Sequence, residues 1–421
     1  MTAIPDSAQS DGTLVDGILE IHAGFIPLID CAPLVIAREQ GFDTAHGISL
    51  ALHKDVSWAN IRDKAEAGVF DCAIMLAPMP LASTLGLGGR APVPMIAAMA
   101  TSLNGNAITV SRSLYGEMLT ADRQHAQAGG MDAAISLARV IERRKGDGSQ
   151  PLTLGMVYPF SCHNYDLRYW LAAAGIDPVN DLNLVVVPPP LIADSLKSGR
   201  IDGFCVGEPW NSVAVAEGSG TIVATKSELW ADSPEKVLGM RAAFVDDNRD
   251  GVERLIRAVT EACAWLDVPA NRAAAAEILA KPEYIGISAN ILARGLCGSL
   301  TRGGVFNGNP EGETIVFSKG GANFPWVSHA AWLLTQMIRW GQVRTPFDIA
   351  EVARRVYRPD LYRAAVAPLG VTTPEMDSKT EGGGQFFGGG TFDPSEPLAY
   401  LERTPLRDTN IDLKSFRRTP V

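Results

Sequence analysis

The feature that most constrains the fold is an alternation of strand and helix patterns with short connections between them. Residues 19–25, 48–52 and 70–75 have the apolar character of buried strands, and stretches with apolar residues at helical spacing separate them. This βαβαβ order predicts a mostly parallel sheet covered by helices. The same alternation returns over about residues 110–239 and predicts a second α/β lobe.

Capping residues and composition place further elements. Ser57 is a favourable N-cap for a helix that ends near Ala67, and Ser161 starts a helix that Gly175 ends. No Gly-Lys-Ser or Gly-Lys-Thr follows the glycine run 86–89, so we interpret it as a helix end and a turn. After Asp250 the pattern predicts long helices at residues 252–265, 272–280, 289–296 and 329–340. A surface loop is expected at residues 303–324, and a mobile glycine-rich segment at residues 382–390.

A short polar segment follows an apolar run near the end of the first strand–helix alternation. Asn104, Gly105 and Asn106 place two amides and one residue without a Cβ atom there. Asn-Gly is a strong turn signal, so a tight turn is one interpretation. The alternative is a ligand site, because amide and backbone N–H groups can approach a small molecule closely at such a break. We expect the chain to cross between lobes near Thr109 and to return near residues 238–245.

The composition excludes several classes of protein. The chain has 421 residues, 46% of them hydrophobic, and a net charge of −10, which argues against nucleic acid held on a basic face. No segment reaches the roughly 18–20 apolar residues that a membrane-spanning helix needs. The six cysteines form no CxxC pair, so we predict buried, reduced thiols rather than a metal or redox site.

The N-terminal residues carry an expectation about location. Residues 1–20 contain Asp6, Asp11, Asp16 and Glu20 and no lysine or arginine. They have neither the basic region nor the apolar region of a secretory signal. We therefore interpret residues 1–18 as a disordered leader and expect a cytoplasmic protein.

Several sequence blocks, in order, resemble the nitrate- and bicarbonate-binding proteins of ABC transporters. They lie between about residues 20 and 360, and they are Gly24-Phe25-Ile26-Pro27-Leu28, Asp30-Cys31-Ala32-Pro33-Leu34, Ser57-Trp58-Ala59-Asn60-Ile61-Arg62-Asp63-Lys64, Met75-Leu76-Ala77-Pro78-Met79-Pro80, Leu103-Asn104-Gly105-Asn106-Ala107-Ile108-Thr109 and Gly207-Glu208-Pro209-Trp210. The resemblance implies a two-lobed periplasmic-binding-protein-like fold of type II, with parallel-type mixed sheets and a ligand cleft between the lobes. We place lobe I at residues 19–109 plus 240–421 and lobe II at 110–239.

The resemblance also implies a function. Among the relatives, the chain looks most like the cytoplasmic nitrate/nitrite sensors that hold an ANTAR-type antiterminator of nitrate-assimilation genes inactive until the ligand binds. We therefore expect a nitrate or nitrite sensor with such a partner, without direct contact to nucleic acid and without membrane insertion. The alternative is the substrate-binding component of a nitrate ABC transporter. Relatives of the same fold that bind thiamine precursors or alkylsulfonates leave a different small ligand open.

Nitrate is a planar anion with three acceptor oxygens, so its site needs hydrogen-bond donors and positive charge. The resemblance implies four ligand-binding residues: the indole of Trp58, the amide of Asn106, the imidazole of His163 at a helix start and the ammonium group of Lys236. It also implies three possible additional cleft residues, Gly105, Pro78 and Glu208. Taken alone, each has an ordinary explanation as a buried aromatic, a turn residue, a structural histidine or a surface lysine. Their joint presence at the family's spacing is what favours an anion site.

Catalysis is the second class of function that the residue types allow. His163, Asp166 and Cys162 contain the residue types of a catalytic triad, but neighbours in sequence seldom form one, and the chain has no nucleophile elbow or metal signature. We expect no enzymatic activity, no cofactor and no metal. Bicarbonate carries a hydroxyl donor that requires an acceptor. With Lys236 rather than an acid at the charged position, we predict nitrate or nitrite over bicarbonate.

Overall fold

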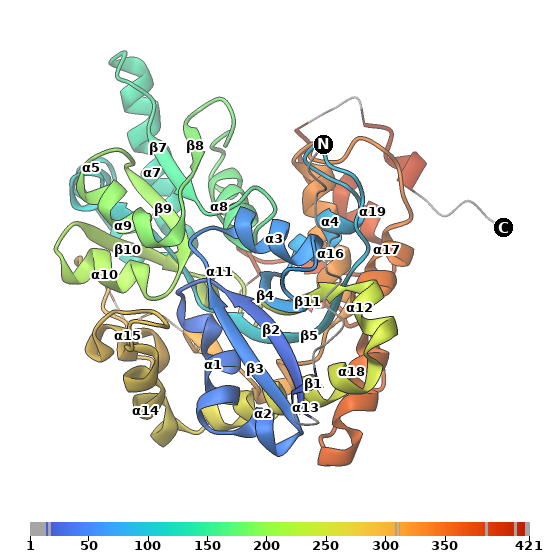
Figure 1. Cartoon of the computed structure of the whole chain (residues 1–421). Helices are drawn as coiled ribbons and strands as arrows, with labels where there is room; N and C mark the ends of the chain where they lie inside the picture. Colours follow the sequence, from blue (N-terminus) through green and yellow to red (C-terminus); the bar gives the residue numbers. More distant parts are fainter. Residues whose placement is uncertain are drawn as a thin grey trace, which may run out of the picture.

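The computed structural model describes the chain except for residues 1–13, 16–17, 308–309, 311, 384–385, 408–410 and 417–421. The described residues form two mixed β-sheets that helices flank (Figure 1), together with a small two-stranded hairpin near the C-terminus. The α/β fold class predicted from the sequence is confirmed.

The first sheet has seven strands in the order β1-β2-β4-β11-β5-β12, and β3 pairs with β2 outside this path. Its strands are β1 (Leu14–Val15), β2 (Ile18–Phe25), β3 (Ile48–Lys54), β4 (Cys72–Leu76), β5 (Met95–Asn104), β11 (Pro234–Arg241) and β12 (Ile315–Val316). β2 runs parallel to β3 and β4, as the alternation of strands and helices predicted. β11 lies antiparallel between β4 and β5, so the sheet is mixed.

The second sheet has five strands in the order β10-β6-β9-β7-β8. They are β6 (Asn106–Ser111), β7 (Thr153–Met156), β8 (Asn183–Val186), β9 (Gly203–Gly207) and β10 (Gly220–Thr225). β7 runs parallel to β8 and β9, whereas β6 is antiparallel to both of its neighbours. This sheet therefore repeats the parallel core and the antiparallel crossing strand of the first sheet.

The chain passes between the sheets at two places. β5 ends at Asn104 and β6 begins at Asn106, and Asn104 (φ 61°) and Gly105 (φ 93°) have left-handed φ values that asparagine and glycine tolerate best. The return lies between Thr225, the last residue of β10, and Pro234, the first residue of β11. Both passages lie a few residues before the positions expected from the sequence. The lobe boundaries at 109/110 and 239/240 stay a prediction.

Helices pack on both faces of the first sheet. One hydrophobic cluster contains residues of α1 (Ala32–Glu39), α13 (Arg249–Leu266), α14 (Pro269–Leu279), α15 (Ala289–Leu296) and α18 (Pro359–Val366). A second cluster contains residues of α3 (Trp58–Glu66), α4 (Met79–Thr84), α16 (Val327–Arg339), α17 (Ile349–Val356) and, from the second sheet, α7 (Gly130–Gly146) and α8 (Cys162–Ala173). Because this second cluster continues from one sheet to the other, apolar burial holds the two halves against each other.

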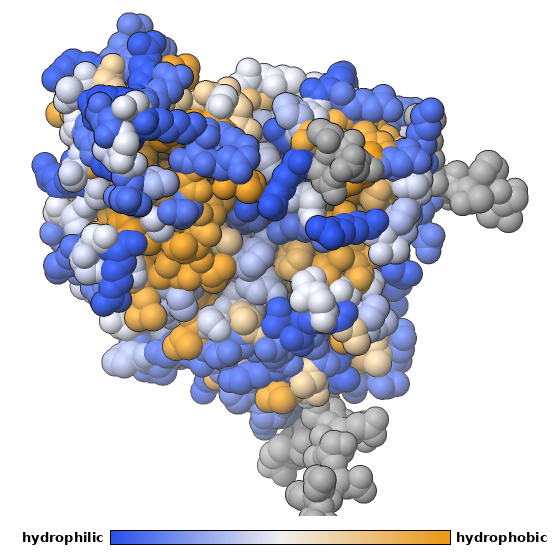
Figure 2. Space-filling view, turned by 90° about the horizontal axis from the view of Figure 1, so that it is seen from above, coloured by the Kyte–Doolittle hydropathy of each residue, from blue (hydrophilic) through white to orange (hydrophobic). Residues whose placement is uncertain are grey.

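The remaining helices are shorter or more peripheral. They are α2 (Phe42–Ala45), α5 (Arg112–Ala121), α6 (Arg123–Ala128), α9 (Pro189–Lys197), α10 (Trp210–Ala216), α11 (Lys226–Leu229), α12 (Ala242–Asp247) and α19 (Pro397–Glu402). Seen from above, hydrophilic residues cover most of the surface around apolar patches (Figure 2). Within the described ranges, no helix combines the length and the apolar character that crossing a bilayer requires.

The long loop expected over residues 303–324 is only partly at the surface. Ile315, Phe317 and Phe324 are buried, and β12 pairs with the end of β5. The sequence prediction was wrong for this half of the loop, because its apolar residues fill an edge of the first sheet despite the surrounding glycine and asparagine.

The glycine-rich segment 382–390 was predicted to be mobile, but its described part has a defined place. It lies between β13 (Glu381–Gly382) and β14 (Thr391–Phe392), which form the small hairpin. Phe386 and Phe387 are buried, and the Phe387 ring stacks on Tyr169 at 4.0 Å between centroids. Two adjacent aromatic side chains therefore anchor a segment whose composition alone suggested mobility.

Two further predictions concern the N-terminus and the cysteines. Of the expected leader, residues 14–15 form β1 and Ile18 starts β2; the other residues lie outside the described ranges. All six cysteines are free, and five are buried as predicted, whereas Cys297 at the end of α15 is exposed.

Candidate functional site

Two helices begin at residues that the resemblance pointed to. Ser57 caps α3 by accepting the N–H of the residue three positions later (3.2 Å), and Trp58 is the first residue of that helix. Ser161 caps α8 in the same way (3.0 Å), and His163 lies in its first turn. Each helix follows a strand of a parallel pair, β3 or β7, so both helix N-termini lie at the carboxyl edges of their sheets. The positive ends of two helix dipoles thus accompany these side chains.

Asn106 and Lys236 lie just after the two passages between the sheets. Asn106 is the first residue of β6, and Lys236 belongs to β11, where the chain has just returned to the first sheet. The pairing of β11 with β5 changes register at Lys236. Successive side chains of a regular strand point to opposite faces, but this irregularity lets Glu235 and Lys236 bond to each other, with 2.7 Å between Oε1 and Nζ.

The carboxylate of Glu235 is the point where the predicted residues meet. Its Oε1 accepts from Lys236 Nζ (2.7 Å) and lies 3.7 Å from His163 Nε2, and its Oε2 accepts from Asn106 Nδ2 (2.6 Å). Trp58 joins the group through Lys236, whose Nζ lies 5.5 Å from the centroid of the indole ring. The structure thus brings all four predicted positions into one cluster. That they bind a ligand stays a prediction.

Sequence reasoning did not assign Glu235 itself to the site, nor three charged residues that complete the cluster. Lys226 Nζ lies 2.6 Å from Glu235 Oε2 and 3.0 Å from Asp166 Oδ2, and Asp30 Oδ2 lies 2.7 Å from Lys236 Nζ. Two lysines and three carboxylates give this cluster a formal charge of −1. Asp30 belongs to one of the sequence blocks that carry the resemblance, and Glu235 directly precedes Lys236, whereas no pattern marked Lys226.

Burial and neighbouring charges set the protonation of the cluster. Burial raises the pKa of Asp166 to about 6, although Lys226 acts in the opposite direction. Burial alone would also raise the pKa of Glu235, but Lys226 and Lys236 hold it below its usual value. Burial lowers the pKa of His163 to about 3, so the ring is neutral near pH 7, with one nitrogen as donor and the other as acceptor.

Several buried polar atoms of the site have no hydrogen-bond partner among the described residues. They are Trp58 Nε1, both ring nitrogens of His163, Asn106 Oδ1 and Asp30 Oδ1. An unsatisfied buried donor or acceptor costs about 1–3 kcal/mol. An indole N–H only donates, so the missing partner of Trp58, which is 1% exposed, has to be an acceptor. The Trp58 N–H and the N–H of His163 therefore fit a small ligand that carries acceptor atoms, whereas Asn106 Oδ1 and Asp30 Oδ1 are acceptors that need donors from elsewhere.

The three additional cleft positions have different surroundings. The N–H of Gly105 donates to the Thr314 carbonyl (2.7 Å), so it is not a free donor here, contrary to the idea that it adds to the anion site. Pro78 is buried at the N-terminus of α4. Glu208 is buried, and its Oε1 has no partner among the described residues, whereas its N–H donates to the Gly105 carbonyl (2.9 Å).

The catalytic alternative finds no matching geometry. Burial raises the pKa of the Cys162 thiol well above its usual value, and its Sγ faces the Glu235 carbonyl at 4.0 Å. Asp166 forms an ion pair with Lys226, and neither ring nitrogen of His163 has a hydrogen-bond partner in the described part of the chain, so these three residues do not form a nucleophile–base–orienter set there. Among the described residues, no group of three or more histidine, cysteine or acidic side chains could hold a metal ion.

Replacing Glu208 with glutamine is expected to stabilise the protein at pH 8 but not at pH 5. Burial raises the Glu208 pKa to about 7 from a usual value near 4.5. The folded state therefore binds this proton more tightly than the unfolded state, and the stability from that proton is lost as the pH rises from about 4.5 through 7. A shift of this size corresponds to at most about 3 kcal/mol. Urea unfolding of both proteins at the two pH values measures the difference.

The surface variant Glu217→Gln is the matched control for Glu208→Gln. Glu217 pairs with Lys197 at the surface, so its removal should change the free energy of unfolding by less than about 1 kcal/mol at both pH values. A gain at pH 8 that is equal in the two variants would contradict the assignment to Glu208.

Comparison with known proteins identifies the family. A family model described as the NMT1-like family matches residues 19–280. The nitrate/nitrite binding protein NrtA of Synechococcus elongatus is 33% identical over 408 residues, which cover 95% of this chain and 89% of that protein. This chain belongs to the NrtA-like family of nitrate-binding proteins. NrtA is named as a nitrate/nitrite binding protein, which is consistent with the binding function predicted from the sequence.

A second relative of this chain differs in length. The nitrate import ATP-binding protein NrtC of Synechocystis sp. strain PCC 6803 is 40% identical over 393 residues, which cover 91% of this chain but 55% of that protein. The chain thus spans about half the length of NrtC. The crystal structure of the periplasmic nitrate-binding protein NrtA from Synechocystis PCC 6803 superposes with a TM-score of 0.84 at 32% identity, covering 92% of this chain and 98% of that one. The predicted periplasmic-binding-protein-like fold is therefore confirmed.

Proposed function

We propose that this chain binds nitrate or nitrite at the cluster of Trp58, Asn106, His163 and Lys236. The observation that carries the proposal is the buried indole N–H of Trp58, which has no hydrogen-bond partner among the described residues. Lys236, which would supply the charge, lies over the same indole ring. Nitrate and nitrite offer acceptor oxygens to this N–H and to a neutral His163 without bringing a donor of their own. Membership of the NrtA-like family supports the same ligand.

The carboxylate of Glu235 supports a site for a planar oxyanion. It is flat, carries two acceptor oxygens, and contacts Lys236, Asn106 and His163 at the same time. Nitrite has the same bent pair of oxygens, and nitrate adds a third. Because the cluster already has a formal charge of −1, an incoming anion would compete with the Glu235 carboxylate for Lys236 rather than bind next to that carboxylate. In this account, Glu235 moves when the ligand binds.

Calorimetric titration with nitrate, nitrite and bicarbonate is expected to show binding of the first two and at least about tenfold weaker binding of bicarbonate. Lys236 and the Trp58 N–H serve acceptors, and bicarbonate brings one hydroxyl donor that has to find an acceptor. Asp30 Oδ1 is a free acceptor in this region, so Asp30→Asn should widen the difference. Tight bicarbonate binding without a nitrate signal would refute the proposed ligand.

A finer part of the proposal is that the chain acts as a cytoplasmic sensor. A region similar to this chain makes up about half of NrtC, a protein named for ATP binding, and ATP is an intracellular nucleotide. This supports an intracellular place, and the resemblance described above supplies the expected partner, an ANTAR-type antiterminator. The substrate-binding component of a nitrate transporter is the alternative, and recovery of the native protein from the periplasm would favour it.

The sensor role predicts that a complex with the antiterminator forms without ligand and dissociates with nitrate or nitrite. Closure of the two lobes changes the surface that a partner can contact. By linkage, the ligand lowers the affinity for the partner by the same factor as the partner lowers the affinity for the ligand. Co-elution from a sizing column, with and without nitrate, measures this. Trp58→Phe should keep the complex intact at a nitrate concentration that releases the wild-type partner. A complex of equal stability in both runs would rule out the sensor mechanism.

A further inference from the structure

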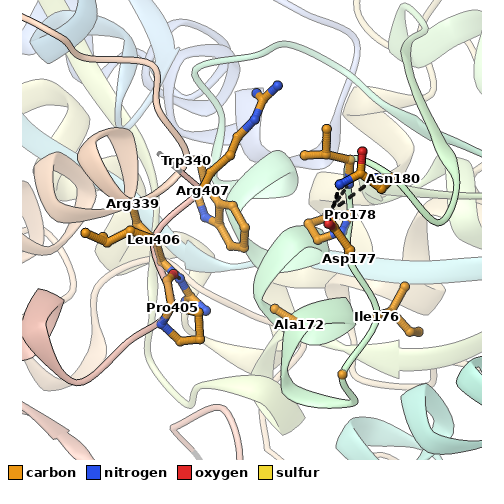
Figure 3. A pocket seen from close by; sticks show the side chains of 12 residues that line it. Ala172, Ile176, Asp177, Pro178, Asn180, Arg339, Trp340, Pro405, Leu406 and Arg407 are labelled. Atoms are coloured by element: carbon orange, nitrogen blue, oxygen red, sulfur yellow. Dashed lines mark hydrogen bonds between the residues drawn. The ribbon is translucent and has the colours of Figure 1, made fainter. Parts of the chain in front are cut away.

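A cavity of about 530 Å³ lies between the C-terminal end of α8 and the C-terminal part of the chain (Figure 3). One wall comes from residues 172–180, which leave α8 toward β8. The opposite wall comes from Arg339 and Trp340 at the end of α16 and from residues 405–407. None of the four predicted ligand-binding residues lines it, so it is separate from the cluster around Glu235.

Two guanidinium groups line this cavity, and a third, that of Arg168, lies behind the Trp340 ring of its wall. Arg339 and Arg407 line it, and the guanidinium carbons of Arg339 and Arg168 lie 4.5 Å and 5.5 Å from the centroid of the Trp340 ring. Within the described part of the chain, none of the three forms an ion pair with a carboxylate. The carboxylate in the wall, Asp177, accepts hydrogen bonds from its own turn and attracts Arg407 and Arg168 only at a distance, without an ion pair. In a chain of net charge −10, a group of cations without paired carboxylates is unusual.

Two wall side chains carry buried donors without a partner among the described residues. Arg339 is 3% exposed and its Nη1 is unpartnered, and Trp340 is 5% exposed with an unpartnered Nε1. Arg168 Nη1 is a third such donor, and burial together with Arg407 lowers the pKa of Arg168 to about 10. Arg339 Nε donates to the Pro405 carbonyl (3.3 Å) and Arg168 Nε donates to Asn164 Oδ1 (2.9 Å), but both acceptors are neutral, and a buried charge without a counter-charge is costly. A bound oxyanion would supply both the missing acceptors and the compensating charge.

We propose that this cavity binds a small organic oxyanion, a carboxylate or phosphate on an apolar body. Its volume exceeds what one inorganic anion fills and lies in the range of small-molecule sites. Pro178 and Leu406 offer the apolar contact surface for the body of the ligand, and the guanidinium groups of Arg339 and Arg407 take the oxyanion. The occupant would touch both α8, which starts beside His163, and the end of α16.

The probe for this site is 2-naphthyl phosphate, titrated calorimetrically into the full chain. It should bind at least about tenfold more tightly than inorganic phosphate, which lacks the body, and than 2-naphthol, which lacks the charge. Arg407→Gln removes one cation whose side chain is exposed, and it should weaken the probe by about tenfold or more without unfolding the protein. Arg403→Gln makes the same charge change on an exposed residue outside the cavity and should leave the probe affinity unchanged.

Equal affinities for 2-naphthyl phosphate and 2-naphthol would overturn the oxyanion site. An equal loss in Arg407→Gln and Arg403→Gln would also overturn it, because net charge alone would then explain the binding. This site and the proposed nitrate site can fail separately. Arg407→Gln should keep wild-type nitrate affinity, and Trp58→Phe should keep wild-type affinity for 2-naphthyl phosphate.

Discussion

Replacing Lys236 with methionine is expected to abolish nitrate binding and to lower the free energy of unfolding by about 3–5 kcal/mol. Lys236 is fully buried, and its Nζ holds Asp30 Oδ2 and Glu235 Oε1 at 2.7 Å each. Methionine fills a similar volume but leaves two carboxylates buried near each other without their shared cation. The same change removes the positive charge that the proposed anion site needs.

Urea unfolding and nitrate calorimetry of Lys236→Met measure the two effects. The matched control is Lys197→Met, which also removes a lysine from an ion pair, but at the surface, where Lys197 Nζ lies 3.0 Å from Glu217 Oε2. The control should lose less than about 1 kcal/mol and keep full nitrate binding. If Lys236→Met were as stable as the control, the buried cluster around Glu235 would not exist in solution as described.

Replacing Trp58 with phenylalanine is expected to weaken nitrate binding by about 10- to 100-fold, with a much smaller effect on folding. The indole N–H has no partner in the described structure, so its loss removes no hydrogen bond from the unliganded protein. The remaining cost comes from the smaller ring and amounts to about 1–2 kcal/mol. Calorimetry and urea unfolding separate the two quantities.

Trp170→Phe is the control for the indole N–H. Trp170 is also fully buried, and it lies in α8, but its Nε1 donates to the Gly130 carbonyl (2.9 Å). Its replacement should cost more stability than Trp58→Phe, because a carbonyl loses its donor, and should leave nitrate affinity unchanged. The opposite ranking of the two variants in the nitrate titration would remove Trp58 from the site.

The elements that place the site follow local rules, which is why the sequence predicted them. Ser57 and Ser161 are N-caps, and each cap depends only on the residues that follow it within one turn. The parallel order of β2, β3 and β4 follows from strand and helix periodicity. The grouping of Trp58 with Lys236, far apart in the chain, came from family resemblance and not from any local pattern.

The charged residues around the site could not be predicted from local sequence patterns. Glu235 and Lys236 are neighbours in a strand, and alternation predicts that their side chains point apart; the register change that joins them depends on how β11 pairs with β5. Lys226 reads as an ordinary helix-start lysine, and only the folded chain places it against Asp166 and Glu235. Composition likewise suggested a mobile segment around Phe386, because its packing partners lie elsewhere in the sequence.

The most direct test of the nitrate site is the NMR resonance of the Trp58 indole N–H during a nitrate titration. Selective ¹⁵N labelling of tryptophan gives one indole signal for each of the eight tryptophans, and the signal missing from Trp58→Phe assigns residue 58. Because this N–H has no acceptor among the described residues, we predict that nitrate shifts its proton strongly downfield, while the Trp170 signal stays in place. Nitrate binding detected by calorimetry with an unmoved Trp58 signal would contradict the account.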